Sequence, residues 1–273
     1  MFGAMIGDVV GSVYEFNNIN TKDFPLLIEE STFTDDTVLT IAVARALVNS
    51  HELKTAEQEK QLYEDTRDSI IQYAREFPDR GYGLRFYEWM YSDDPQPYNS
   101  YGNGSAMRVS PVGWAYESLE ETLKAAEITA SPTHNHPEGI KGAQAVAGAI
   151  FLLRNGESKA EVKSFIQSKF RYDLSRSVDE VRETNMFNET CQGSVPEAII
   201  CFLEGKDFED VLRNAISIGG DSDTIAAIAC SIAEAVYPID RELRDGVIDI
   251  LASGFDTEDF EFYKERVKDK LPG

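Results

Sequence analysis

Four stretches of the chain are apolar nearly all round at the length of a helix, and this feature constrains the fold most. Val38–Val48 reads VLTIAVARALV, and its many small side chains suit a helix that is buried on every side. The comparable runs are Gly142–Leu153, Glu197–Leu203 and Ile225–Val236. No segment sustains the period-2 alternation of β-branched residues that would indicate a strand. The sequence therefore predicts an all-α fold.

Amphipathic stretches lie between these runs and are expected to cover them. They are Glu57–Phe77, Leu119–Thr129, Lys159–Phe170, Phe208–Ile218, Arg241–Leu251 and Thr257–Lys270. Ser118 and Ser158 each precede a glutamate at capping-box spacing, and Pro137 and Pro196 stand where a helix can begin. The runs of buried type occur early, midway and late, and no linker separates two different halves. We therefore expect one domain over residues 1–273.

Acidic side chains greatly outnumber basic ones. The chain has 48 Asp and Glu against 26 Lys and Arg, a formal net charge of −22. Such an excess leaves no broad basic surface for nucleic acid, and an anionic membrane would repel it. Hydrophobic residues make up 42% of the chain and aromatic residues 11%, which disfavours disorder. We expect no binding of long nucleic acid and no membrane association.

The cysteines and histidines are too few and too scattered for a zinc framework. The three cysteines, at positions 191, 201 and 230, form no C-x-x-C pair, and there are only three histidines. No targeting segment is visible, and no apolar run approaches the roughly 18 residues of a membrane span. We expect a cytoplasmic protein with reduced thiols, and the sequence leaves the oligomeric state open.

Two short acidic clusters each precede a helix of the buried type. The first is Thr34-Asp35-Asp36-Thr37 and the second is the GGDSDT segment Gly219–Thr224. Asp and Thr also cap helices, so either cluster alone fits a purely structural role. Each cluster, however, holds two carboxylates and no basic partner, and burying such groups is costly without positive charge. Hard divalent cations take oxygen ligands, and two facing clusters would hold two ions at about 3.5–4 Å from one another.

The first sixteen residues add a further carboxylate. Glycines at positions 3, 7 and 11 would form a small-residue stripe on a helix, suited to close packing within the chain. On such a helix Asp8 and Glu15, seven residues apart, would share a face. Tight helix packing explains the glycines but does not explain a carboxylate at Glu15 among apolar neighbours.

Two loops are candidates for ligand contact. Ser92–Gly104 reads SDDPQPYNSYGNG, and Gly102 and Gly104 would let consecutive backbone N–H groups approach a phosphate. The same residues also make ordinary turns, and Tyr101 either stacks on a ligand or joins the core. The segment 134–136, His-Asn-His, precedes Pro137 and reads as a turn or as ligands, although magnesium or manganese prefers oxygen.

Five segments, in order, resemble the ADP-ribosylglycohydrolase family, which includes dinitrogenase-reductase-activating glycohydrolase and the ADP-ribosyl-acceptor hydrolases. They are GAMIGDVVGSVYEF, FTDDT, SYGNGSAMRVSPVG, THNHPEGIKGAQA and IGGDSDT. The resemblance runs from Gly3 to about Val236, and the region Ser158–Thr190 carries no family motif. One such motif would be weak, whereas five in the family's order are specific.

The resemblance implies an orthogonal helical bundle around a binuclear site for two divalent cations, Mg²⁺ or Mn²⁺. The implied metal ligands are Thr34, Asp35, Asp36, Asp221, Asp223 and Thr224. Glu15 matches a glutamate implicated in catalysis, and Asp36 is the competing candidate. The residues that match substrate-contacting positions are Tyr101, Gly102, Asn103, Gly104, Ser105, Met107, His134 and Asn135.

The implied reaction is hydrolysis of the glycosidic bond at C1 of the distal ribose in an ADP-ribosyl group, with an oxocarbenium-like transition state. The substrate would be an ADP-ribosylated protein or small molecule, and the product ADP-ribose. The acceptor linkage stays open, with Ser92–Asn103 as a candidate selectivity loop. Two alternatives remain: an inactive ADP-ribose-binding or crystallin-like member, and a magnesium-dependent nucleotide pyrophosphatase. For the latter, the acidic pair in residues 180–183 is short and isolated.

Overall fold

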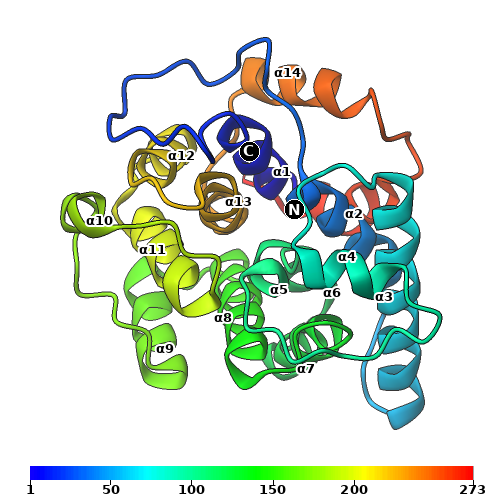
Figure 1. Cartoon of the computed structure of the whole chain (residues 1–273). Coiled ribbons are helices and arrows are strands. Elements are labelled where there is room, and N and C mark those ends of the chain that lie inside the picture. The colour runs from blue at the N-terminus through cyan, green and yellow to red at the C-terminus, as the bar shows by residue number, and fades with distance from the viewer. Residues whose placement is uncertain (273) are drawn as a thin grey trace.

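The computed structural model describes residues 1–272, and these residues form helices with no strand among them (Figure 1). The prediction of an all-α fold is confirmed. The helices of the described chain are α1 to α14, followed by a π-helical turn at Tyr263–Val267 and a 3₁₀ turn at Lys268–Lys270. Apolar side chains from the early, middle and late helices pack in one buried cluster.

Two helices from opposite ends of the sequence lie side by side near the middle of the molecule (Figure 1). They are α1 (Phe2–Gly11) and α13 (Ser222–Ala233), and every residue of both is buried. The glycine stripe of α1 faces α13: a Cβ atom on Gly7 would lie 2.3 Å from the Ala226 carbonyl carbon. One on Gly3 would lie 2.3 Å from the Cys230 carbonyl oxygen. The stripe therefore serves packing within the chain, as predicted.

The remaining apolar runs also form buried helices. They belong to α2 (Asp35–Leu47), α8 (Pro137–Arg154) and α11 (Cys191–Glu204). The amphipathic helices cover them: α3 (Ala56–Glu76) packs on α2, α7 (Leu119–Ala130) and α9 (Lys159–Phe170) pack on α8, α12 (Phe208–Ser217) packs on α11 and α13, and α14 (Arg241–Leu251) contacts α1. Capping supports these boundaries: Ser118 and Ser158 accept hydrogen bonds from Glu121 N and Glu161 N.

Four short helices are not evident in the apolar pattern. They are α4 (Leu84–Met90), α5 (Gly104–Met107), α6 (Val112–Ala115) and α10 (Val178–Thr184). None is longer than seven residues, so none shows two full periods of an amphipathic pattern.

Several predicted boundaries are wrong. Pro196 lies inside α11, because Thr190 caps the helix six residues earlier by accepting from Gly193 N. Helix α1 ends at Gly11, so Glu15 lies in the following turn and not on a helical face shared with Asp8. The stretch Thr257–Lys270 is not one continuous helix but ends in the π-helical and 3₁₀ turns.

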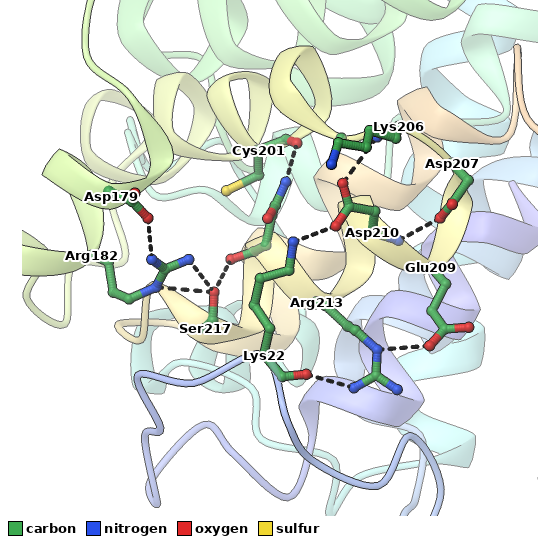
Figure 2. A network of polar contacts seen from close by, with 12 residues as sticks. Lys22, Asp179, Arg182, Cys201, Lys206, Asp207, Glu209, Asp210, Arg213 and Ser217 are labelled. Atoms are coloured by element: carbon green, nitrogen blue, oxygen red, sulfur yellow. Dashed lines mark hydrogen bonds and ion pairs between the residues drawn. The ribbon is translucent and has the colours of Figure 1, made fainter.

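Polar contacts on α12 fasten the segment that joins α1 to α2 (Figure 2). Arg213 Nη1 donates to the carbonyl oxygens of Lys22 at 2.8 Å and Phe24 at 2.9 Å, and Lys22 Nζ pairs with Asp210. Arg182 on α10 donates to Ser217 Oγ at 2.9 Å, which fastens the segment before α11 to the same helix. Both fastened segments lead into the candidate active site.

The three cysteines are buried thiols without a disulfide, as the sequence predicts. Within residues 1–272, no helix combines the length and the apolar character that crossing a membrane requires.

Candidate active site

The N-terminal ends of α2 and α13 meet, and each end carries one of the two acidic clusters. Asp35 and Asp36 open α2, while Asp221 and Asp223 flank the first residue of α13. The Thr224 hydroxyl donates a hydrogen bond to Asp36 Oδ2 over 3.0 Å. Asp36 Oδ1 is buried and has no hydrogen-bond partner within residues 1–272. The two clusters therefore form one site that contains a buried carboxylate oxygen without a donor.

Asp8, on the buried face of α1, holds the first cluster in place. Its Oδ2 atom accepts from the backbone N–H groups of Thr34 and Thr37, each at 3.0 Å, and its Oδ1 atom accepts from Thr34 Oγ1 at 2.7 Å. Thr34 also caps α2 by accepting from Asp36 N at 3.3 Å. Sequence reasoning did not include Asp8 among the site residues. The signal that could have identified it is a single acidic residue among the apolar residues and glycines of α1.

A turn after α1 brings Glu15 to the second cluster. Asn18 clamps this turn, since its Nδ2 atom donates to the carbonyl oxygens of Glu15 and Gly220, both at 2.9 Å, and its Oδ1 atom accepts from Gly220 N at 2.8 Å. Gly219 and Gly220 have φ angles of +66° and +79°, a conformation that favours glycine. The carboxylate oxygens of Glu15, Asp221 and Asp223 lie within 4.8 Å of one another.

The pKa values of the clustered acids are all raised. Burial is the main cause for Asp8, Asp35, Asp36, Asp221 and Asp223, and it disfavours the charged carboxylate. Neighbouring carboxylates raise the pKa values further for four of these. Asp8 acts on Asp35, Asp223 on Asp36, Asp221 on Asp223, and Glu189 on Asp221. Burial and the charge of Asp221 raise the pKa of Glu15 to about 7. No salt bridge reaches these six acids within residues 1–272, so the site is suited to a cation.

A cavity of about 320 Å³ opens beside the acids. The predicted residues that line it are Glu15, Asp35, Asp36, Gly102, Asn103, Gly104, Met107, His134, Asp221, Asp223 and Thr224. Asn103 links the glycine-rich loop to the acidic site, because its Nδ2 atom donates to Asp221 Oδ2 at 2.6 Å. The glycine-rich loop and the acidic site therefore share one cavity.

Four predicted residues do not line this cavity. Thr34 is occupied with Asp8, and Ser105 Oγ donates to the Gly139 carbonyl at 2.7 Å. Asn135 Oδ1 accepts from Asn99 N at 2.7 Å. The Tyr101 ring is 48% exposed and lies 5.3 Å from the His136 ring, centroid to centroid. Thr34, Ser105 and Asn135 are thus engaged in hydrogen bonds within the protein, and the Tyr101 ring lies against His136.

The predicted phosphate cradle is smaller than the sequence indicates. The Asn103 N–H donates to the Glu189 carbonyl at 2.7 Å, and the Gly102 N–H donates to Ser100 Oγ at 3.2 Å. Both amides are thus occupied by contacts within the protein. Gly104 begins α5, and a Cβ atom there would lie 3.2 Å from the His134 ring. Because Gly104 has no side chain, the His134 imidazole can pack closely against the loop.

Sequence reasoning did not single out ten further residues that line the cavity. They are Leu39, Gly81, Gly83, Leu84, Arg85, Phe86, Tyr98, Ser100, Arg108 and Glu189. Arg85 Nη2 donates to the Tyr98 carbonyl at 2.6 Å, and its guanidinium lies 5.0 Å from the Tyr98 ring centroid. The turn-rich segment around Gly81 and the long loop that contains Tyr98 were visible signals, but their meeting was not.

Comparison with known proteins identifies this arrangement. The family model for ADP-ribosylglycohydrolase matches residues 1–265. The chain belongs to the ADP-ribosylglycohydrolase family. Among its relatives, ADP-ribosylhydrolase ARH3 of Homo sapiens is 31% identical, over 88% of this chain and 84% of that protein. ADP-ribosylarginine hydrolase Tri1 of Pseudomonas putida is 24% identical, over 88% of this chain and 70% of that protein.

A solved structure shares the fold of this family member. It is described as an ADP-ribosylglycohydrolase-related protein complex, and the two chains superpose with a TM-score of 0.68 over 96% of each. The sequences are 23% identical, so the match concerns the fold. The family model and the 31% identical relative confirm the resemblance that the five sequence segments carry.

Proposed function

We propose that this chain is a metal-dependent hydrolase that cleaves the glycosidic bond at C1 of the distal ribose in ADP-ribosyl groups and releases ADP-ribose. Membership of the ADP-ribosylglycohydrolase family supports the reaction class. Similarity to an ADP-ribosylhydrolase and to an ADP-ribosylarginine hydrolase supports ADP-ribosylated molecules as substrates.

The observation that carries the proposal is the meeting of the two acidic clusters beside the cavity. Four buried aspartates and the half-buried Asp35 have raised pKa values there, and within residues 1–272 no donor reaches Asp36 Oδ1. Oxygen ligands of this kind fit Mg²⁺ or Mn²⁺. Two such ions would be held by Asp35, Asp36, Asp221, Asp223 and Thr224, with Thr34 also matching a ligand position. Bound divalent cations would compensate the negative charge and favour ionisation of water.

Glu15 is the proposed proton-transfer residue. In the metal-free protein, burial and the neighbouring acids raise its pKa to about 7, and a carboxylate beside the proposed cation ligands can accept a proton and return it. It lines the cavity, and the Asn18 clamp fixes its backbone. Asp36 is the competing candidate, but it already accepts from Thr224 Oγ1 and lies deeper. Glu15 would therefore accept and return the proton during hydrolysis, while Asp36 would bind a cation.

The glycine-rich loop and His134 are proposed to hold the ADP-ribosyl group. Asn103, Gly104, Met107 and His134 line the cavity next to the acids. The hydrogen bond from Asn103 to Asp221 fixes the loop relative to the acidic cluster. A sugar held by the loop would therefore have a fixed position relative to the acids. Holding the reacting bond in one orientation removes much of the entropic cost of the reaction.

The alternatives receive less support from the residues. An inactive ADP-ribose-binding member is disfavoured because all the predicted acids are present and gathered. For a nucleotide pyrophosphatase, Glu180 and Glu183 would be needed, yet both are exposed on α10 and neither lines the cavity. The group to which ADP-ribose is linked in the substrate stays open. The candidates are arginine, serine, an O-acyl group, a nucleobase and another small molecule.

A panel of defined substrates tests the proposal. Peptides carrying ADP-ribose on arginine or serine, O-acetyl-ADP-ribose and ADP-ribosylated nucleobases would be incubated with the protein and Mg²⁺ or Mn²⁺. Free ADP-ribose is the expected product from at least one linkage, and Asp35→Ala and Asp223→Ala should abolish its release. Asp179→Ala is the matched control, since this side chain is 86% exposed on α10. Formation of AMP, or ADP-ribose binding without turnover on any linkage, would contradict hydrolysis of the glycosidic bond.

A further inference from the structure

Arg108 is a buried cation that the proposed reaction does not use. It lies just after α5, lines the cavity and is only 1% exposed. Its Nε and Nη1 atoms have no hydrogen-bond partner within residues 1–272, and no carboxylate of that part of the chain forms a salt bridge with it. A charge buried in this way destabilises the fold, so a role in packing alone does not explain an arginine.

The one short hydrogen bond of Arg108 leads to Thr133. Its Nη2 atom donates to Thr133 Oγ1 at 2.8 Å, with longer contacts to the carbonyl oxygens of Thr129 and Ala130 at 3.4 and 3.5 Å. Thr133 is fully buried, and its Oγ1 atom lies 2.7 Å from His134 Nδ1. Arg108, Thr133 and His134 thus form a continuous chain of hydrogen bonds that ends at the cavity.

The order of donors fixes the tautomer of His134. Arginine only donates, so the Thr133 oxygen accepts from Arg108. The hydroxyl hydrogen then needs an acceptor, and within residues 1–272 the available partner is His134 Nδ1. A neutral imidazole that accepts at Nδ1 carries its proton on Nε2. Burial, followed by the charge of Arg108, lowers the pKa of His134 well below its usual value and favours this neutral form.

The Nε2 atom lies on the side of the glycine-rich loop. Cβ atoms on Gly102 and Gly104 would lie 3.5 and 3.2 Å from it, and all three residues line the cavity. No protein acceptor within residues 1–272 bonds to Nε2, whereas Nδ1 is engaged. The ring therefore presents an unused N–H donor where the ADP-ribosyl group is proposed to bind.

We propose that Arg108 and Thr133 are positioning residues that hold His134 as an Nε2–H donor to an acceptor oxygen of the bound ADP-ribosyl group. This inference rests on the proposed function for the identity of the ligand. A neutral donor of fixed direction recognises an oxygen atom without adding a charge that would have to be desolvated on binding. The cost of burying Arg108 is then offset by a donor that is oriented before the substrate arrives.

Nuclear magnetic resonance of ¹⁵N-labelled histidine tests the tautomer directly. The chain has only three histidines, and His51→Gln and His136→Asn assign the other two signals. The expected spectrum of the wild type shows His134 with unprotonated Nδ1 and protonated Nε2. A proton on Nδ1 would overturn the proposal without any variant of Arg108 or Thr133.

Substitutions at Thr133 test the consequence for binding. Thr133→Val removes the hydroxyl at nearly constant volume and should weaken ADP-ribose binding by about tenfold. Thr133→Ser keeps the hydroxyl and should retain both the wild-type affinity and the tautomer of His134. The matched control is Thr129→Val at the end of α7, four residues earlier, whose similarly buried hydroxyl donates only to the Ala125 and Ala126 carbonyls. Equal affinity of Thr133→Val and Thr129→Val would overturn the positioning role. If the wild type bound no ADP-ribose, the proposed function would fail, and the histidine spectrum would still decide the tautomer.

Discussion

The Thr224 hydroxyl donates a hydrogen bond to Asp36 Oδ2 over 3.0 Å, across 188 residues of sequence. Through this contact the N-terminal end of α13 meets that of α2. Asp8 of α1 holds the same end of α2 by accepting hydrogen bonds from the Thr34 and Thr37 amides. The three helices are among the most buried of the fold. The acids consequently have fixed positions and little solvent, which makes them a site that a cation would stabilise.

Divalent cations are expected to stabilise the folded protein through this site. At a cation concentration 100 times the dissociation constant, the free energy of unfolding should rise by about 2.7 kcal/mol, or about 5–10 °C in Tm, for each cation that binds. Asp223→Asn should remove this shift and leave the metal-free protein as stable or more stable, because one repelling charge is gone. Asp179→Asn, at an exposed position, should retain the shift. A wild-type melting temperature unchanged by both Mg²⁺ and Mn²⁺ would contradict cation binding.

Without metal, stability should fall as the pH rises. The folded pKa values of the clustered aspartates lie above the ordinary value of 3.8, and that of Glu15 is about 7, so the folded state binds more protons than the unfolded state in between. The free energy of unfolding is then highest, as far as these groups contribute, below about pH 4 and decreases through the raised pKa values. Thermal melting in chelator should show a declining Tm from pH 5 to pH 8. A Tm that increases over this range would disagree with the raised pKa values, and Asp36→Asn should flatten the decline.

Close contact between α1 and α13 should make Gly7 intolerant of a side chain. Gly7→Ala would place a Cβ atom 2.3 Å from the carbonyl of Ala226, where the backbone cannot easily move. We expect a loss of about 1–3 kcal/mol or more in the free energy of unfolding. Gly83→Ala is the control, since a Cβ atom there meets nothing within 4 Å. Chemical denaturation measures both, and equal stability of the two variants would show that the helices are not in close contact.

Removing the proposed proton-transfer group should separate catalysis from binding. Glu15→Gln keeps the size of the side chain but cannot accept a proton, so the hydrolysis rate should fall about 100-fold or more. The affinity for ADP-ribose, measured by calorimetry, should change by less than about threefold. Glu183→Gln, at an exposed site on α10, provides the control. If Glu15→Gln kept more than a tenth of the wild-type rate while Asp36→Asn lost all activity, the role would pass to Asp36.

Much of the helical framework follows from local sequence. The apolar run Val38–Val48 and the glycine stripe of α1 each indicate a buried element by composition alone. The acidic clusters stand out for the same reason, since charges directly before uncharged helices are conspicuous. Long, strongly patterned segments therefore predict both the fold class and the position of the acids.

The contacts that complete the site depend on tertiary structure. Asp8 and Glu15 do reach the same site, but by a buried helix and a turn rather than by one helical face. The amides of Gly102 and Asn103 bond to the protein, which no local pattern reveals. Helix α4 supplies a wall of the cavity although its seven residues are too few to show a period. These features arise where segments distant in the sequence meet.

The most direct test of the central claim is release of ADP-ribose from a cleavable substrate by metal-stripped and metal-restored protein. Wild-type protein treated with chelator should lose hydrolysis, and added Mg²⁺ or Mn²⁺ should restore it. Asp36→Asn should show no restoration, because the acid that joins the two clusters is absent. Full release of ADP-ribose by the metal-stripped wild type would contradict the account.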